Sequence, residues 1–385
     1  MREIVEKKCN GCHACMAVCS QHCIKMECNE EGFLYPKIQE DKCIHCNLCE
    51  KICPVLHVHS TTQHEALTAY AAVNTNDIIR LNSSSGGIFS LLAEHVIEQG
   101  GVVFGAIFDE KFNVIHSYTE KIEELPKFQG SKYVQSKIGQ AYIEAEKFLK
   151  AGRYVLFTGT PCQIEGLKAY LRKDYENLFT QDLICHGVPS PLVWEKYLDY
   201  RKVQANGLPP KKIAFRRKDE GWKRFSVAFQ YENATEYRKT LDKDPMMQVF
   251  LKDLCLRESC YECAFKSKNR NSDITLADFW GIQRVMPEMD DDKGTSLVII
   301  HSQKGKKFFE NIVQNLRYKE VDIEQAILHN SAMIKSANKP KKREMFMRDI
   351  KNGDFVCVQE KYCKETLRVK IRKALSKIKH KLLRR

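Results

Sequence analysis

The sequence of 385 residues lacks the features of several large classes of proteins. No apolar run approaches the roughly 20 residues that a helix needs to cross a bilayer. The segment before Cys9 is short and charged, so it does not resemble a secretory signal, and an extracellular disulfide scaffold is not expected. With 43% hydrophobic and 29% charged residues, we expect a soluble, globular and cytoplasmic protein.

An acidic surplus is also missing, and the positive charge is concentrated at one end of the chain. The net charge is +13, and residues 361–385 contain eleven Lys or Arg but one acid, Glu365. We therefore expect no nucleic-acid-binding surface over the body. In this tail, apolar residues recur at helical spacing: Leu367, Ile371, Ala374, Leu375, Ile378, Leu382 and Leu383. Two interpretations stay open, a basic amphipathic helix in peripheral contact with an anionic membrane, and a helix packed on the body or a solvated end.

Cysteine, in contrast, is abundant, and ten of the 17 cysteines fall within the first 53 residues. Eight of them form two copies of the pattern Cys-x2-Cys-x2-Cys-x3-Cys. Three thiolates two residues apart wrap one cubane, while the fourth reaches the neighbouring cluster. The pattern predicts two [4Fe–4S] clusters, the first held by Cys9, Cys12, Cys15 and Cys53, and the second held by Cys43, Cys46, Cys49 and Cys19.

Two observations bear on this prediction. Zinc prefers two Cys-x2-Cys pairs separated by a longer gap, so it has no use for the third closely spaced thiol. The first motif has Ser20 where the second has Pro54, and Cys23 and Cys28 are surplus. Each surplus thiol is either a spare ligand or a buried free cysteine, and the second role is the expected one. Oxygen-sensitive clusters and free thiols together indicate a reducing cytoplasm, typical of an anaerobe.

The chain divides into three regions. We expect a two-cluster ferredoxin-type domain at residues 1–60, a larger body at 61–335 and a basic C-terminal region at 336–385. In the body, predicted strands at 154–157 and 178–184 are each followed by a helix, which is typical of α/β folds. Further along the chain the pattern changes to hairpins. The fold class predicted is therefore α+β, a ferredoxin-like module followed by a mixed α/β body whose sheet is not entirely parallel.

A second group of cysteines lies in the body, at Cys162, Cys185, Cys255, Cys260 and Cys263. Two of them follow predicted strands, where open sheets place ligand sites. Only the last two have the spacing of a ligand pair. Spacing alone leaves two alternatives open, a third cubane, and buried structural thiols together with a zinc pair.

Several uncommon strings occur in the order found in one family. They are Ser84-Ser85-Gly86-Gly87 and the segments 130–135, 157–163, 182–190, 260–263 and 277–281. Because of these strings, residues 66–328 resemble the β-subunit family of coenzyme F420 (deazaflavin) hydrogenases and dehydrogenases. A ferredoxin module is fused in front of this region. The resemblance implies an FAD-containing iron–sulfur oxidoreductase. It implies that a third cluster is held by Cys162, Cys185, Cys260 and Cys263, with Cys255 as an alternate.

The residues also suggest a flavin site. The Ser84–Gly87 segment precedes a predicted helix at 88–98, and free backbone N–H groups at a helix N-terminus suit a pyrophosphate. Lys132 and Tyr133 offer a cation and a stacking ring. On the residues alone, an ordinary capped helix and a solvated loop are the expected interpretation, and the resemblance reverses this ranking in favour of the flavin. It adds Thr158, Gly159 and Thr160 to the cofactor-binding set.

His186 is the candidate catalytic residue, because hydride chemistry at a flavin needs a proton partner; a structural His is the alternative. Two basic clusters, 216–223 and 266–270, either bind an acidic substrate, dock an acidic ferredoxin or are solvated loops. We expect electrons to pass between a ferredoxin or another electron-transfer protein, three [4Fe–4S] clusters and FAD, with hydride transfer to a small organic acceptor. The alternatives are a deazaflavin-coenzyme reductase or oxidase, and an electron-relay subunit of a larger hydrogenase or dehydrogenase complex.

Overall fold

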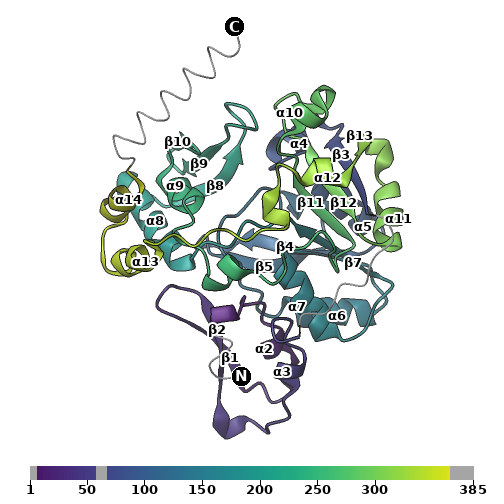
Figure 1. Cartoon of the computed structure of the whole chain (residues 1–385), viewed down its shortest axis with the longest axis horizontal. Helices are drawn as coiled ribbons and strands as arrows, with labels where there is room; N and C mark the ends of the chain where they lie inside the picture. The colour runs from purple at the N-terminus through teal and green to yellow at the C-terminus, as the bar shows by residue number, and fades with distance from the viewer. Residues whose placement is uncertain (1–6, 58–66, 365–385) are drawn as a thin grey trace.

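The computed structural model describes residues 7–57 and 67–364. It contains a small N-terminal module, a large mixed sheet covered by helices, and a three-stranded sheet with its own helices (Figure 1). Among the helices in these ranges, none is long and apolar enough to cross a membrane.

The N-terminal module repeats one backbone conformation in its two cysteine motifs. Its elements are α2 (Ala14–Val18), α3 (Leu48–Lys51), β1 (Ile24–Cys28) and β2 (Leu34–Ile38), the strands pairing antiparallel. Left-handed residues occupy equivalent places in each motif, Gly11 and His13 in the first and His45 and Asn47 in the second. The duplication in the sequence is therefore also a duplication of the loops that carry the thiols.

The body contains an eight-stranded sheet in the order β13-β3-β12-β11-β7-β6-β4-β5. Neighbours among β4, β6, β7 and β11 pair parallel, and the other neighbours pair antiparallel, which confirms the prediction of a mixed sheet. The strands are β3 (Thr68–Asn74), β4 (Val102–Phe108), β5 (Val114–Thr119), β6 (Val155–Thr158), β7 (Leu178–Leu183), β11 (Ile274–Asp278), β12 (Ser296–Ile300) and β13 (Leu316–Val321).

Helices cover both faces of this sheet, which explains why a strand such as β12 is buried along its whole length. One apolar cluster joins the first face to α5 (Ile88–Glu98) and α11 (Gln303–Glu310). Two others join the opposite face to α6 (Ala141–Lys150), α7 (Pro161–Leu171), α10 (Ile282–Val285) and α12 (Ile323–Ile327). A short helix, α4 (Asp77–Asn82), follows β3.

The N-terminal module packs on the face covered by α6 and α7. Ala14 and Ile52 of the module lie in the same apolar cluster as Ile164 and Leu167 of α7. Figure 1 shows the module beneath these two helices. Because the first cysteine motif is at this contact, the module is oriented with its first set of thiols toward the body.

The three-stranded sheet has the order β10-β9-β8 and is antiparallel, with β8 (Pro210–Arg217), β9 (Ser226–Tyr231) and β10 (Glu236–Thr240). It packs against α8 (Pro191–Gln204), α9 (Pro245–Leu251), α13 (Arg343–Asn352) and α14 (Phe355–Cys363). Phe346 and Phe355 of the last two helices are buried in this core, so residues 343–363 pack with the body. The predicted tail helix lies outside the described residues.

Candidate functional site

The first set of thiols joins the two cysteine motifs. Cys9, Cys12 and Cys15 come from the first motif, and Cys53 from the end of the second lies beside them. Burial raises the pKa of Cys15, and the nearby thiols of Cys9 and Cys53 raise it further. Burial and the same neighbours also raise the pKa of Cys12. The chain therefore brings together the four thiols predicted for the first cluster.

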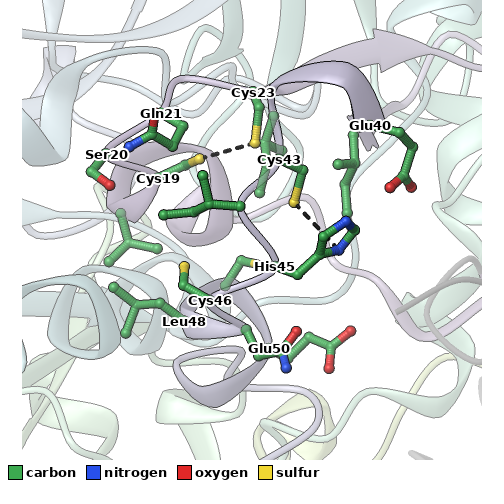
Figure 2. Close-up of a pocket in the computed structure, with 16 residues that line it drawn as sticks. Cys19, Ser20, Gln21, Cys23, Glu40, Cys43, His45, Cys46, Leu48 and Glu50 are labelled. Carbon is green, nitrogen blue, oxygen red and sulfur yellow. Dashed lines mark hydrogen bonds between the residues drawn. The ribbon is translucent and has the colours of Figure 1, made fainter.

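The second set of thiols surrounds a cavity of about 310 Å³, lined entirely by residues 18–50 of the module. Figure 2 shows the sulfur atoms of Cys19, Cys23, Cys43 and Cys46 around it, and Cys49 also lines it. Cys19 Sγ lies 3.4 Å from Cys23 Sγ. The four thiols predicted for the second cluster are thus joined by a fifth.

The environments of Cys19 and Cys23 differ. Burial opposes ionisation of Cys19, but hydrogen bonds from the Cys23 backbone and thiol outweigh it and lower the pKa of Cys19. Burial raises the pKa of Cys23 to about 12, and the Cys19 thiol contributes. Because iron binds the thiolate form, Cys19 is the better suited fourth ligand. Cys28, the other surplus thiol, is exposed and points toward the Gly32 carbonyl at 3.6 Å.

The third set of thiols lines a cavity of about 280 Å³ in the body, which we call the body cavity. Parallel strands β6 and β7 end at the same edge of the sheet, so the loops after them meet there. Cys162 lies in the first turn of α7 and Cys185 follows β7, while Cys260 and Cys263 come from the 3-10 helix η3 (Glu258–Glu262) and the residue after it. Burial raises the pKa of Cys162, and the neighbouring thiols of this set raise it further.

Cys255, the alternate ligand, does not line the body cavity. It is fully buried in the core around α8 and α9, and burial raises its pKa to about 12. Instead, the module contributes Lys8, Asn10 and Val55 to the lining. The third set of thiols therefore faces the module that carries the first set.

Both cavities, of about 310 and 280 Å³, have room for a group larger than one ion. In residues 7–57 and 67–364, no three His, Cys, Asp or Glu side chains are arranged to hold a single metal ion. Buried polar atoms without a partner in this part of the chain include Asn10 Nδ2 and Ser259 Oγ, both on residues that line the body cavity. Unpaired buried donors beside four thiols fit an iron–sulfur cluster, whose sulfur atoms accept hydrogen bonds.

The segments predicted to bind flavin come together at the N-terminus of α5. Ser84 Oγ lies 2.7 Å from Ser131 Oγ, and Gln129 Nε2 donates to Ser90 Oγ at 2.9 Å. Helix α5 has no side-chain cap, and Gly87 before it has a φ of +83°. This uncapped helix N-terminus keeps the property that suits a phosphate.

Gly86 packs closely against the sheet. A Cβ there would lie 2.4 Å from the Ala72 carbonyl oxygen of β3. Its backbone N–H donates to Ser296 Oγ at 2.9 Å, and Ser85 Oγ donates to the Thr295 carbonyl at 2.8 Å. The absence of a side chain at Gly86 therefore allows the loop to pack on the sheet.

Lys132 and Tyr133 are held by protein groups. The Lys132 ammonium lies 3.1 Å from the Gln129 carbonyl, with the Phe128 and Gly130 carbonyls also in reach. Burial lowers the pKa of Lys132 to about 7. Tyr133 stacks on Phe250 with ring centroids 4.8 Å apart. The loop is therefore fixed in place.

Thr160, one of the residues predicted to bind flavin, contacts the third set of thiols. It forms a capping box with Gln163 at the start of α7, and its Oγ1 lies 3.1 Å from Cys162 Sγ. Thr158 Oγ1 donates to the Phe104 carbonyl at 2.9 Å, and the Gly159 N–H donates to the Gln181 carbonyl at 3.1 Å. These three residues shape the edge of the sheet at which Cys162 is presented.

His186 lies on the rim of the body cavity. Its side chain is 43% exposed, and its Nε2 lies 2.5 Å from Asp253 Oδ1. Its ring meets the edge of Phe250 at 5.5 Å, and Phe250 stacks on Tyr133. The Phe250 ring thus lies between His186, the predicted catalytic residue, and Tyr133, which was predicted to bind flavin.

The two basic clusters are largely neutralised within the protein. Arg216 pairs with Asp278, and Lys268 pairs with Glu324. The Lys218 ammonium donates to three carbonyls at 2.7 Å, including that of Ser85, and burial lowers its pKa to about 7. These cations therefore stabilise loops of the site, and the proposal that they dock an acidic partner gains no support from their surroundings.

Three functional features were missed by reasoning from the sequence. Arg257 and Gln135 hold the loop of the first cysteine motif, and His116 binds the Thr158 carbonyl at 3.0 Å, with its pKa lowered to about 4 by burial. Gln135 lies within the family string 130–135, which was the available signal. Arg257 and His116 belong to no motif in the sequence, so nothing marked them as residues of the site.

Comparison with known proteins finds a family match in both parts of the chain. Residues 152–326 match the family model for the C terminus of the beta subunit of coenzyme F420 hydrogenase/dehydrogenase, and residues 8–56 match the 4Fe-4S dicluster domain. These matches confirm the resemblance drawn from the sequence and the N-terminal dicluster domain. Among solved structures, a chain of the F420-reducing [NiFe] hydrogenase complex from Methanosarcina barkeri is similar, with 17% identity, a TM-score of 0.46, and coverage of 77% of this chain and 90% of that chain. No curated protein matches the sequence.

Proposed function

From a 4Fe–4S dicluster domain joined to a region matching the C-terminal domain of coenzyme F420 hydrogenase/dehydrogenase β-subunits, we propose an iron–sulfur flavoprotein oxidoreductase. It holds three [4Fe–4S] clusters and FAD, and it links an electron-transfer protein such as ferredoxin to a small organic acceptor. When bound, the clusters supply one-electron chemistry and the flavin supplies two-electron hydride chemistry.

One observation carries this proposal. The body cavity of about 280 Å³ is lined both by the third set of thiols and by Asn10 and Val55 of the module. Asn10 lies between Cys9 and Cys12 in sequence, so the first and third sets meet at this junction. A route for single electrons between the module and the body follows from that proximity.

The residues of the chain have distinct tasks in this proposal. The twelve thiols bind the clusters, with Cys19 favoured over Cys23 by its lowered pKa. The N-terminus of α5 and the loop that contains Ser131 would hold the flavin phosphates, because Ser84 and Ser131 are in contact there. His186 holds or releases a proton at the imidazole, oriented by the Asp253 carboxylate. The third set of thiols is half-buried at the body cavity, which limits the access of water to it.

A second candidate is reduction or oxidation of the deazaflavin coenzyme itself. The family name of the match over residues 152–326 favours this coenzyme as the organic acceptor. The two candidates share their protein-bound cofactors and differ only in what meets the flavin. Anaerobic spectral titration with the deazaflavin coenzyme, and separately with reduced ferredoxin, distinguishes them.

Iron, sulfide and flavin analysis of anaerobically purified protein tests the cofactor content. We expect about twelve iron atoms and one FAD per chain, and about eight iron atoms after Cys263→Ser. Cys255→Ser is the matched control, since that buried thiol does not line the cavity, and it should keep all the iron. About eight iron atoms in the wild-type protein would remove the third cluster from the proposal, and equal losses in both variants would argue against its ligands.

A further inference from the structure

Arg257 is fully buried at the junction between the N-terminal module and the body. Its Nε donates to the Cys9 carbonyl at 2.7 Å, and its Nη2 donates to the Leu34 carbonyl at 2.9 Å. Its Nη1 donates to Gln135 Oε1 at 2.9 Å, and Gln135 Nε2 donates in turn to the Asn10 carbonyl at 2.9 Å. One guanidinium therefore binds both cysteine-bearing and hairpin segments of the module from the body side.

Among the described residues, the hydrogen-bond acceptors of Arg257 are uncharged. Each of its three acceptors is a backbone carbonyl or a side-chain amide oxygen, and the guanidinium lies 4.1 Å from the centroid of the Tyr35 ring. A buried cation costs several kcal/mol unless an anion balances it. None of the acceptors of Arg257 supplies that anion. Arg343, also at this junction, differs because Glu31 accepts from it.

Arg257 lies beside both neighbouring sets of thiols. On one side, Gly11 of the first motif is so close that a Cβ there would lie 2.9 Å from Arg257 Nη1. On the other side, the Cys260 N–H of the third set donates to the Arg257 carbonyl at 2.9 Å. Four thiolates and a cubane carry net negative charge, which increases by one on reduction.

We propose that Arg257 is the counter-charge for the first and third clusters and sets their reduction potentials. This inference rests on the proposed cluster content. A fixed cation favours the more negative, reduced form, so Arg257 raises both potentials relative to an uncharged residue. It is a positioning residue as well, because it holds the Cys9 loop against the body.

The test is an EPR-monitored reductive titration of the full-length, anaerobically purified protein. We expect Arg257→Met to shift the first and third clusters to lower potential by at least a tenfold change in the reduced-to-oxidised ratio, about 59 mV for a one-electron couple. Arg257→Lys keeps the charge and should stay near the wild type. The second cluster, in a cavity lined only by residues 18–50, is the internal reference.

Two further variants make the result decisive. Gln135→Glu places a carboxylate on the same guanidinium without removing it, and should lower the same two potentials even where Arg257→Met fails to fold. Arg201→Met removes a buried guanidinium that stacks on Tyr237 in the three-stranded domain, and should leave the potentials unchanged.

The outcomes separate this inference from the proposed function. Unchanged potentials in Gln135→Glu with full iron content overturn the inference and leave the function standing. An equal shift in Arg201→Met also overturns it, because general destabilisation would then be the cause. Wild-type protein without iron at these thiols would instead contradict the proposed function itself.

Discussion

Arg343, near the end of the described chain, donates two hydrogen bonds of 2.5 Å to the carboxylate of Glu31 in the N-terminal module. The Arg343 side chain is 3% exposed and that of Glu31 is 25% exposed, and Arg343 also donates to the Leu256 carbonyl at 2.8 Å. A two-pronged pair of this kind is among the strongest and most directional ion pairs. The module is thus held to a helix more than 300 positions away in the sequence.

We expect Arg343→Met to lower the stability of the protein by about 3 kcal/mol, because it leaves the Glu31 carboxylate without its partner. Thermal unfolding under anaerobic conditions measures the change. Lys351→Met is the matched control, since its pair with Glu30 is 3.4 Å long and both side chains are exposed. The control should change stability by less than about 0.5 kcal/mol. A control as damaging as Arg343→Met would contradict this view of the junction.

The contact between Cys19 and Cys23 gives a prediction about the second cluster. Cys19→Ser should reduce the iron content by about four atoms per chain, because it removes the thiol that ionises more readily. Cys23→Ala should keep the iron, because that thiol stays protonated. Iron analysis and the EPR spectrum of the reduced protein provide the measurement. Loss of iron from Cys23→Ala alone would exchange the roles of the two residues.

Lys132 predicts a dependence of stability on pH. Its folded pKa is lowered by burial to about 7, whereas an unfolded Lys has a pKa near 10.4. Between these values the unfolded chain binds a proton that the folded chain does not, so stability rises with pH. Relative to Lys132→Met, the wild type should gain about 1 kcal/mol per pH unit from about pH 7.5 to 9.5. Urea denaturation of both proteins checks this.

Lys127→Met serves as the control for the pH experiment. Lys127 is exposed and pairs with Glu124 in the same segment of the chain. Its removal should leave the pH dependence of the wild type unchanged. A parallel pH profile for wild type and Lys132→Met would show that Lys132 keeps its proton in the fold.

Gly11 provides a test of the first cluster loop. Its φ is +68°, and a Cβ would lie 2.9 Å from both Arg257 Nη1 and Gln135 Nε2. Gly11→Ala should therefore displace the loop and weaken cluster binding, seen as iron loss during anaerobic gel filtration. Gly152→Ala is the control, because Gly152 has a similar φ of +79° but nothing lies within 4 Å of an added Cβ. This variant therefore has the backbone strain of about 1–2 kcal/mol without the crowding. Equal iron content in both would contradict the proposed crowding.

Much of the fold could be predicted where local pattern and tertiary contacts agree. The helix expected at 88–98 coincides with α5, and the predicted strands at 154–157 and 178–184 lie within one residue of β6 and β7. The mixed sheet was also expected. The order of strands β13, β3 and β12 could not be predicted. Antiparallel pairing between residues more than 200 positions apart leaves no periodic signal in either strand.

The candidate site was predicted to a similar extent. The thiol sets were found because cysteine spacing is specific and because the family strings place Cys162 and Cys185 beside the Cys260 pair. The burial of Cys255 could not be predicted, because its place near the Cys260 pair in sequence does not show that its side chain lies in the core around α8 and α9. The contacts of Gly86 and Lys132 depend on which strand packs beside them, which a sequence does not reveal.

The exposure of Cys46 sets the order in which the protein would be damaged by air. Cys46 is exposed, and the neighbouring Ile44 is 62% exposed, whereas Cys9 and Cys12 of the first set are buried. Dioxygen meets the outermost thiols first, because diffusion to the inner ones requires the module to open. Under the proposed function, damage would therefore begin at the second set of thiols and would interrupt electron exchange with a partner before it reached the first set. If the proposed cofactors are bound, an aerated sample would retain part of its colour after it had lost its external electron supply.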